Sequence, residues 1–381
     1  MKARIWILLH ALVALLPVIG AVAQAPDVRL FGSEVPPALP QTWSLDAWRH
    51  EQLQPALQAW FEAHVGFRGV MVRTDNTVQA IAFRDSKPAS VVLEGDEETL
   101  FINDDVHYMG TRSGDLPYVL SKVAALTERA AVVQRKLAAR GKKLVIVIAP
   151  SKTAIYPEDV RPRWRRGKDD RADLVVHEAL REGLERNGVK FVDGHTLLGS
   201  WRGESRELVF TRSGRHWTTL GACLVLRQAL LDGPITPACT YAMEPGDRQE
   251  STDFDLYRLR NVWRFERAPH LLPLLTERGK APEQAPGSAP RPRTLFIGSS
   301  FMWMLAEALR PLVESPRAFY YNQTVYDVSE TLRPIEPVDA DSPRWSGYVL
   351  DPDLYVLELL ETYAHGEQMA TFLETLDRRL D

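Results

Sequence analysis

The fold is decided by Tyr118 to Ala149, which reads "YVLSKVAALTERAAVVQRKLAARGKKLVIVIA". Apolar residues recur at helical spacing up to the "GKK" turn, which predicts a long amphipathic helix. The run that follows at once, Leu144 to Ala149, is apolar throughout, as strands buried on both faces are. The stretch therefore predicts a helix that leads directly into a central strand, which is half of a βαβ unit.

The same alternation continues along the rest of the chain. Predicted helices cover residues 173–188, 219–233 and 301–313, and predicted strands cover residues 189–194, 294–298 and 354–360. This order predicts an α/β fold with a parallel sheet and helices on both faces. Upstream, residues 46–83 carry the pattern of two helices and residues 91–103 that of a hairpin. Residues 279–293, "GKAPEQAPGSAPRPR", lack apolar periodicity and are expected to form a flexible loop within one domain.

The N-terminus has the pattern of an export signal. Lys2 and Arg4 precede an apolar run from Ile5 to Ala23, and the "AVA" at its end offers small residues to a signal peptidase. The run is also near the lower length limit for spanning a bilayer, so an uncleaved inner-membrane anchor is the alternative. We expect residues 1–23 to be a signal peptide or N-terminal anchor, and residues 24–381 to form one exported body in the periplasm.

Composition argues against a nucleic acid partner and a metal site, and it leaves open whether the two cysteines are bridged. The net charge is -4, with 46 Lys and Arg dispersed among 50 Asp and Glu, so a nucleic acid partner is not expected. The histidines show no HxxxH spacing and the cysteines no CxxC spacing, so neither a metal nor another cofactor is expected. Cys223 and Cys239 suit an oxidising compartment, where a bridge and two unpaired thiols are the alternatives.

Chemistry is expected where the predicted strands end, because ligands of open parallel sheets gather outside the carboxyl ends of the strands. The strand that ends in "GSSFMW", residues 298–303, turns directly into a helix and places Ser300 at a helix N-terminus. The polar turn "RSGRHWTTLG", residues 212–221, presents His216. A serine nucleophile and a histidine base are the residue types of an acyl-transfer pair. Helix capping by Ser299 or Ser300, and a surface position for His216 at a helix N-terminus, are the alternatives.

Several blocks of sequence occur in the same order as in a known family. They are "FEAHVGFRG" at 61–69, "VVLEGDEETLF" at 91–101, "VIAPSKTAIYPE" at 147–158, "LVFTRSGRHWTTLGA" at 208–222, "LFIGSSFMWML" at 295–305 and "PDLYVLELLET" at 352–362. With these blocks the chain resembles the alginate O-acetyltransferase family of exported, SGNH-hydrolase-like proteins, the AlgJ and AlgX type. The resemblance implies an SGNH-hydrolase-like fold, with Ser300 as nucleophile and His216 as base.

The family pattern carries an aspartate two residues before this histidine, and the chain has Gly214 there. Such an aspartate orients the imidazole, and its replacement by the amide lowers turnover by about four orders of magnitude. Three possibilities follow: another carboxylate has taken over, an unsupported dyad works slowly, or the site is inactive. Asp104 and Asp105 are the carboxylates considered, the second because "DVH" at residues 105–107 imitates the missing pattern.

Three further residues are weighed near the predicted site. Lys152, at a strand end, is expected to meet the carboxylate of an acidic sugar. Asn322, in "YYNQ", is expected to donate to an oxyanion, because SGNH-type sites resemble one another in this use of an asparagine, or else to be an ordinary loop residue. Arg215 would lower the pKa of His216 if its guanidinium lay beside the imidazole. A solvent-facing position for Arg215 is the expectation we prefer.

The resemblance implies an exported O-acetyltransferase that moves acetyl groups onto hydroxyls of a bacterial exopolysaccharide or cell-wall glycan through an acetyl ester of Ser300. The implied acetyl donor is a membrane-bound O-acyltransferase, since acetyl-CoA is absent outside the cytoplasm. A carbohydrate acetyl esterase, which gives the acetyl group to water, needs the same pair of residues. A non-catalytic glycan-binding or scaffold member of a polysaccharide export apparatus is the third hypothesis, and Gly214 is the feature that favours it.

Overall fold

The computed structural model describes residues 6, 15–23, 25–32, 37–40, 43–51, 53–83, 91–108, 115–165, 170–202, 206–231, 235–245, 252–263, 271–276, 290–363 and 366–381. Much of the predicted signal or anchor at 1–23, and most of the loop expected at 279–293, lie outside these residues. No described helix has the length and apolar character needed to cross a membrane.

The chain divides into two compact units. One comprises Met1–Val92 with Tyr257–Arg267, and the other Leu93–Leu256 with Ala268–Asp381. One domain over residues 24–381 is the expectation from the sequence, whereas this division places the N-terminal helices in a unit other than the α/β body.

The first unit is built from short helices. They are α2 (Leu45–Arg49), α3 (Leu53–His64) and α4 (Arg68–Phe83). Asp27 caps α4, because its carboxylate accepts hydrogen bonds from the N–H groups of Gly69 at 2.7 Å and Val70 at 3.2 Å. Asn76 of α4 donates to the carbonyl of Arg260 at 2.8 Å, which ties the later segment of the chain into this unit.

The second unit contains the main sheet, which within the described residues has seven strands in the order β10-β9-β8-β7-β11-β3-β4. Their bounds are β3 Lys143–Ala149, β4 Phe191–Asp193, β7 Arg293–Gly298, β8 Glu314–Tyr320, β9 Thr324–Asp327, β10 Arg333–Pro337 and β11 Leu354–Leu360. Strands β8, β7, β11, β3 and β4 run parallel, and β9 and β10 extend the sheet in antiparallel fashion. The predicted α/β fold with a parallel sheet is confirmed, and the antiparallel extension is an addition to it.

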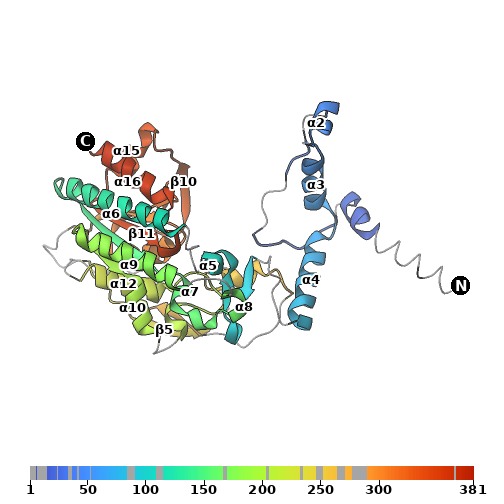
Figure 1. Cartoon of the computed structure of the whole chain (residues 1–381), viewed down its shortest axis with the longest axis horizontal. Helices are drawn as coiled ribbons and strands as arrows, with labels where there is room; N and C mark the ends of the chain where they lie inside the picture. Colours follow the sequence, from blue (N-terminus) through green and yellow to red (C-terminus); the bar gives the residue numbers. More distant parts are fainter. Residues whose placement is uncertain are drawn as a thin grey trace. The chain divides into compact units, whose positions relative to one another are not determined.

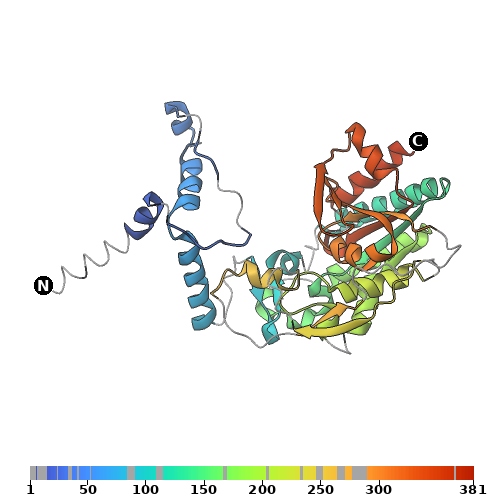
Figure 2. The ribbon, with the colours of Figure 1, turned by 180° about the vertical axis from the view of Figure 1, so that it is seen from behind.

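Helices cover both faces of this sheet (Figure 1; Figure 2 shows it from behind). One core contains side chains of α6 (Leu116–Ala138), α9 (Asp170–Arg186) and α16 (Glu367–Arg379), and the other contains side chains of α10 (Gly194–Trp201), α12 (Thr219–Ala229) and α14 (Met302–Leu309). Along β11, Tyr355 and Leu357 enter the first core and Val356 enters the second. Because both faces are covered, the central strands appear in the sequence as apolar runs and not as alternating patterns.

Smaller elements surround the sheet. Strands β1 (Val92–Glu94) and β2 (Leu100–Ile102) pair, as do β5 (Tyr241–Pro245) and β6 (Leu271–Leu275). The short helices are α5 (Asn103–Tyr108), α7 (Lys152–Ile155), α8 (Pro162–Arg165), α11 (Arg206–Val209), α13 (Asp255–Leu259) and α15 (Pro343–Val349). The pairing of β1 with β2 confirms the hairpin predicted at residues 91–103.

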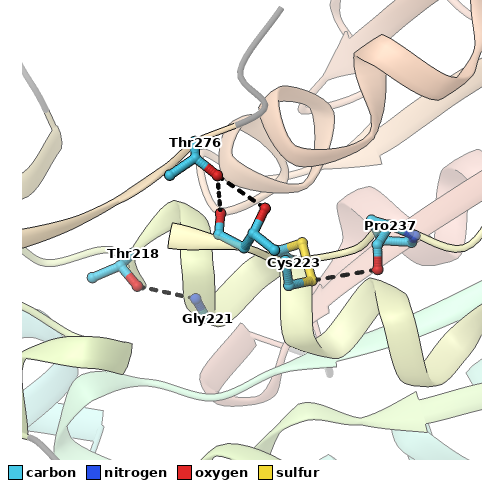
Figure 3. Close-up of a disulfide and its surroundings, with 7 residues drawn as sticks. Thr218, Gly221, Cys223, Pro237 and Thr276 are labelled. Carbon is cyan, nitrogen blue, oxygen red and sulfur yellow. Dashed lines mark hydrogen bonds between the residues drawn. A yellow bond between two sulfur atoms is a disulfide. The ribbon is translucent and has the colours of Figure 1, made fainter. Parts of the chain in front are cut away.

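A disulfide links Cys223 of α12 to Cys239, with their Cα atoms 5.7 Å apart (Figure 3). Beside it, the hydroxyls of Thr240 and Thr276 are hydrogen-bonded at 2.9 Å, next to the point where β5 pairs with β6. The bridge therefore ties α12 to the segment that leads into β5. Of the two alternatives left by the sequence, the structure has the bridge.

We predict that the folded protein, purified without reductant, contains no thiol that reacts with a labelling reagent. Reduction, or the double substitution Cys223→Ala with Cys239→Ala, should lower the free energy of unfolding by about 3 kcal/mol, because the bridge closes a loop of about 16 residues. Denaturant titration with and without reductant measures this loss. Two labelled thiols in the native protein would contradict the prediction.

Candidate active site

The serine turn begins where β7 ends at Gly298 and leads into α14. Ser299 satisfies the helix start, because its Oγ accepts a hydrogen bond from the N–H of Phe301 at 3.2 Å and its carbonyl accepts one from the N–H of Met302 at 3.2 Å. The hydroxyl of Ser300 is therefore not used for capping. In the part of the chain that the structure describes, no hydrogen bond occupies the N–H of Ser300.

The histidine turn lies between α11 and α12. Thr218 caps α12, with its Oγ accepting a hydrogen bond from the N–H of Gly221 at 3.0 Å (Figure 3). Trp217 is fully buried, and its indole N–H donates to the carbonyl of Phe301 at 3.0 Å. This bond joins the histidine turn to the serine turn and fixes how the two face each other.

The structure brings His216 and Ser300 together. His216 Nε2 lies 2.7 Å from Ser300 Oγ, although the two residues are 84 positions apart in the sequence. The ring of Phe301 packs against the imidazole, with the centroids 4.8 Å apart. A hydroxyl and an imidazole nitrogen at this distance are within the reach that a general base requires.

Asp255 completes the arrangement from the start of α13. Its Oδ2 lies 2.7 Å from His216 Nδ1, on the far side of the ring from Ser300. Its Oδ1 accepts hydrogen bonds from the backbone N–H groups of Arg215 at 2.8 Å and Leu256 at 2.6 Å. Both oxygens are thus held by the histidine turn, Oδ2 by His216 and Oδ1 by the N–H of Arg215. Ser300, His216 and Asp255 have the geometry of a nucleophile, a base and an orienting carboxylate.

Sequence analysis missed Asp255, and no local signal marks it. An aspartate at the start of a helix is most simply explained as a cap, and Asp255 lies 39 positions from His216. Gly214 stands where the family pattern has its aspartate, and it has no side chain to contact His216. Its backbone N–H donates to Thr211 Oγ1 at 3.0 Å. The missing carboxylate is therefore supplied from a different segment of the chain.

The two carboxylates considered from the sequence do not bind His216. Asp104 is exposed, and Asp105 is buried and forms a bidentate ion pair with Arg215, at 2.7 Å and 3.2 Å. This pair also corrects the expected solvent-facing position of Arg215. Although burial disfavours its charge, the Asp105 carboxylate raises the pKa of Arg215 above its ordinary value. Arg215 is therefore a fixed cation bound to Asp105.

The position of Lys152 corrects the expectation that it binds an acidic sugar. Its side chain is 2% exposed, and its ammonium donates to the carbonyls of Leu100, Arg212 and Gly214, each at 2.9 Å. An ammonium has three donors, and three carbonyls accept from it. Lys152 therefore holds the histidine turn in place from inside the fold.

Asn322 lies in the turn between β8 and β9. The neighbouring N–H of Tyr321 donates to the carbonyl of Gly298 at 3.0 Å, so this turn is bound to the strand end that precedes Ser300. The φ angle of Asn322 is 55°, in the left-handed region that asparagine tolerates better than most residues. Its Oδ1 is buried and has no hydrogen-bond partner among the described residues. Its role as an oxyanion donor stays a prediction.

A buried acid, Glu358 of β11, lies next to the serine turn. It is 1% exposed, and its Oε2 accepts a hydrogen bond from the N–H of Ser299 at 2.6 Å. A Cβ on Gly298, whose φ is 158°, would come within 2.4 Å of that oxygen, so only glycine fits there. Burial raises the pKa of Glu358 to about 7, and the Ser299 hydrogen bond opposes this. Its Oε1 has no partner among the described residues.

Comparison with known proteins identifies relatives of this chain. Residues 92–304, which include Ser300, His216 and Asp255, match the family described as SGNH hydrolase-like domain, acetyltransferase AlgX. The probable alginate O-acetylase AlgJ of Pseudomonas aeruginosa is 28% identical over 258 residues, which are 61% of this chain and 61% of that protein. The chain thus matches about three fifths of the length of this curated relative.

Two solved structures are also similar. The O-acetyltransferase domain of Pseudomonas putida AlgJ is 17% identical, with a TM-score of 0.43 over 76% of this chain and 99% of that one. Pseudomonas aeruginosa AlgX is 13% identical, with a TM-score of 0.45 over 77% of this chain and 69% of that one.

We predict that Glu358→Gln changes how stability depends on pH. Since the folded state raises the pKa of this carboxyl from 4.5 to about 7, it binds the proton more tightly than the unfolded chain does. The wild-type protein should therefore lose up to about 3 kcal/mol of stability as pH rises from below 4.5 to above 7. Glu358→Gln should lack this loss, as urea titrations at several pH values can measure.

Glu314→Gln, at an exposed position of β8, is the control and should follow the wild-type pH profile. Parallel profiles for wild type and Glu358→Gln would show that Glu358 does not titrate in this range.

Proposed function

Because the chain belongs to the family of SGNH hydrolase-like acetyltransferase domains of the AlgX type, we propose that it transfers acetyl groups onto hydroxyls of a bacterial exopolysaccharide or cell-wall glycan. The observation that supports this most is the continuous set of contacts from Ser300 through His216 to Asp255, at 2.7 Å and 2.7 Å. A glycan-binding relic has no need of these contacts, and they remove the argument that Gly214 gave for a non-catalytic role.

The proposed first step forms the acetyl-enzyme. Ser300 Oγ attacks the carbonyl carbon of the acetyl donor while its proton passes to His216 Nε2. The carboxylate of Asp255 stabilises the imidazolium that forms and keeps Nδ1 protonated. The tetrahedral intermediate then collapses, the bond to the leaving group breaks, and His216 returns the proton to that group. Ser300 is left as an acetyl ester.

The second step moves the acetyl group to the glycan. A sugar hydroxyl gives its proton to His216 Nε2 and attacks the ester of Ser300, and the proton then returns to Ser300 Oγ as the ester bond breaks. The N–H of Ser300 is suited to stabilise the oxyanion of both intermediates, because it belongs to the nucleophile's own residue and has no acceptor among the described residues. The proposed second donor is the side chain of Asn322, from the turn bound to Gly298.

The setting proposed for this reaction is the periplasm. The apolar segment at residues 5–23 follows Lys2 and Arg4, as in export signals or N-terminal anchors, and the Cys223–Cys239 disulfide suits an oxidising compartment. Outside the cytoplasm acetyl-CoA is absent, so the acetyl group must be supplied across the membrane. A membrane-bound O-acyltransferase is the proposed donor.

We predict that a small activated acetyl ester acetylates Ser300, and that Asp255→Asn lowers kcat by about 10⁴-fold with little change in KM. Mass spectrometry of the modified peptide and steady-state kinetics measure the two effects. Ser300→Ala should form no adduct. Gly214→Asp is the matched control: since Asp255 already binds Nδ1 of His216, a second carboxylate should not raise turnover.

The same assay separates the rival functions. Acetylated oligosaccharide as product supports transfer, and acetate as the sole product supports a carbohydrate esterase. If wild type, Ser300→Ala and Gly214→Asp are folded, bind glycan and are equally inert, the proposed chemistry is wrong for this chain.

We also predict that Asn322→Gly lowers kcat by about 10²-fold to 10³-fold, the usual effect of losing one oxyanion donor. Glycine is chosen because the φ of 55° would strain an alanine. Gln323→Ala, at the exposed next position of the same turn, should keep wild-type kcat. Equal kcat values for Asn322→Gly and wild type would assign the second donor to another group.

A further inference from the structure

We propose that His177, His195 and Glu361 form a binding site for a divalent transition metal of the zinc class. Each of the three offers one ligand atom, and these atoms all lie within 4.8 Å of one another. His177 belongs to α9, His195 to α10, and Glu361 directly follows β11. Zinc binds imidazole nitrogens and carboxylate oxygens at about 2.0–2.2 Å, so an ion would bind here with a rotation of the side chains that brings these atoms into one coordination shell.

The carboxylate of Glu361 is already oriented. Its Oε1 accepts hydrogen bonds from the backbone N–H of Ser151 at 2.9 Å and from the Ser151 hydroxyl at 3.3 Å. Its Oε2 faces His195 Nδ1 at 2.7 Å. One oxygen is thus anchored to Ser151 after β3, and the other is directed toward His195, as a monodentate metal ligand needs to be.

The imidazole of His177 is held by a carboxylate of its own. Asp193 Oδ1 lies 3.1 Å from His177 Nε2, and Asp193 is in turn fixed by the N–H and hydroxyl of Thr196, at 3.1 Å and 2.7 Å. A carboxylate on one nitrogen of an imidazole is the usual partner that fixes the ring when a metal binds the other nitrogen. The ring of His195 stacks on that of His177, with centroids 4.4 Å apart.

Solvent reaches this cluster mainly at His195. His177 and Glu361 are each 7% exposed, whereas the side chain of His195 is 20% exposed. His195 is the ligand that solvent reaches most, so an ion would enter from its side. Two buried ligands and one accessible ligand suit a tetrahedral ion that keeps one exchangeable position.

The donor set selects the class of metal. Two imidazoles with one carboxylate is a set typical of zinc, whereas calcium and magnesium prefer oxygen ligands alone. No metal is expected from the sequence, because the chain has no HxxxH or CxxC spacing. Here the parallel sheet brings Glu361 to His195 across 166 positions, so a spacing pattern could not reveal the site.

The bound ion would join α9, α10 and the segment after β11, and the residues that hold these ligands lie at the carboxyl ends of the strands. Asp193 ends β4, Ser151 follows β3 and Glu361 follows β11, while Ser300 follows β7 at the carboxyl end of the neighbouring strand. A metal here would hold α9 and α10 to this edge and stabilise the folded chain. The proposal does not depend on acetyl transfer, because binding and stability report on it directly.

The test is a zinc titration of the full-length, chelator-treated protein in competition with a chromogenic zinc indicator, with bound metal counted by elemental analysis. We expect one equivalent of zinc per chain and a rise in the melting temperature of the wild type. Asp193→Asn should weaken zinc binding about 10-fold to 100-fold. His177→Ala and His195→Ala, which remove ligands, should weaken it further and abolish the rise in melting temperature.

His216→Ala is the matched control, since His216 also pairs with a carboxylate but lies outside the cluster, and it should bind zinc as the wild type does. If the buried His177→Ala variant fails to fold, the partly exposed His195→Ala variant decides. No stoichiometric zinc in the wild type, or equal affinity in the wild type and His195→Ala, would overturn the proposal whether or not the protein transfers acetyl groups.

Discussion

The turn that presents His216 is held by the ammonium of Lys152, which donates to the carbonyls of Leu100, Arg212 and Gly214 at 2.9 Å each. A buried charge is costly unless it is well hydrogen-bonded, so this arrangement tolerates little movement of the three carbonyls. Arg212 and Gly214 belong to the histidine turn itself, and Leu100 to β2. The position of His216 therefore depends on an interaction that contains none of the reacting groups.

The carboxylate that contacts His216 comes from Asp255, and not from position 214, where the family pattern has its aspartate. Asp255 reaches His216 Nδ1 from α13, and its other oxygen accepts the N–H of Arg215, the residue directly before the histidine. The histidine turn thus helps to position the carboxylate that orients its own imidazole. Because Asp255 contacts His216 Nδ1, no carboxylate is needed at position 214. The carbonyl of Gly214 instead accepts a hydrogen bond from the ammonium of Lys152.

Much of the fold follows from patterns within single segments. Strands β3 and β11 can be predicted as apolar runs, because burial on both faces leaves few polar positions. The long helix before β3 can be predicted from the helical spacing of its apolar residues. Ser300 and His216 were predictable because their two turns occur together, in order, within sequence blocks that resemble those of a known family. Asp255, Lys152 and the pairing of Arg215 with Asp105 were not predictable, because each depends on a contact between distant segments. The contact of Glu358 with the N–H of Ser299 was not predictable either, because it joins β11 to the turn after β7.

The central claim is that Asp255 orients His216, which activates Ser300. It is tested most directly by the rate at which an aryl sulfonyl fluoride modifies the protein, followed by intact mass, because this reaction needs neither the natural donor nor the glycan. The account predicts a single adduct on Ser300 that forms far more slowly in Asp255→Asn and at an undiminished rate in Asp104→Asn, a change at an exposed carboxylate. Modification of another residue, or an unchanged rate in Asp255→Asn, would contradict it.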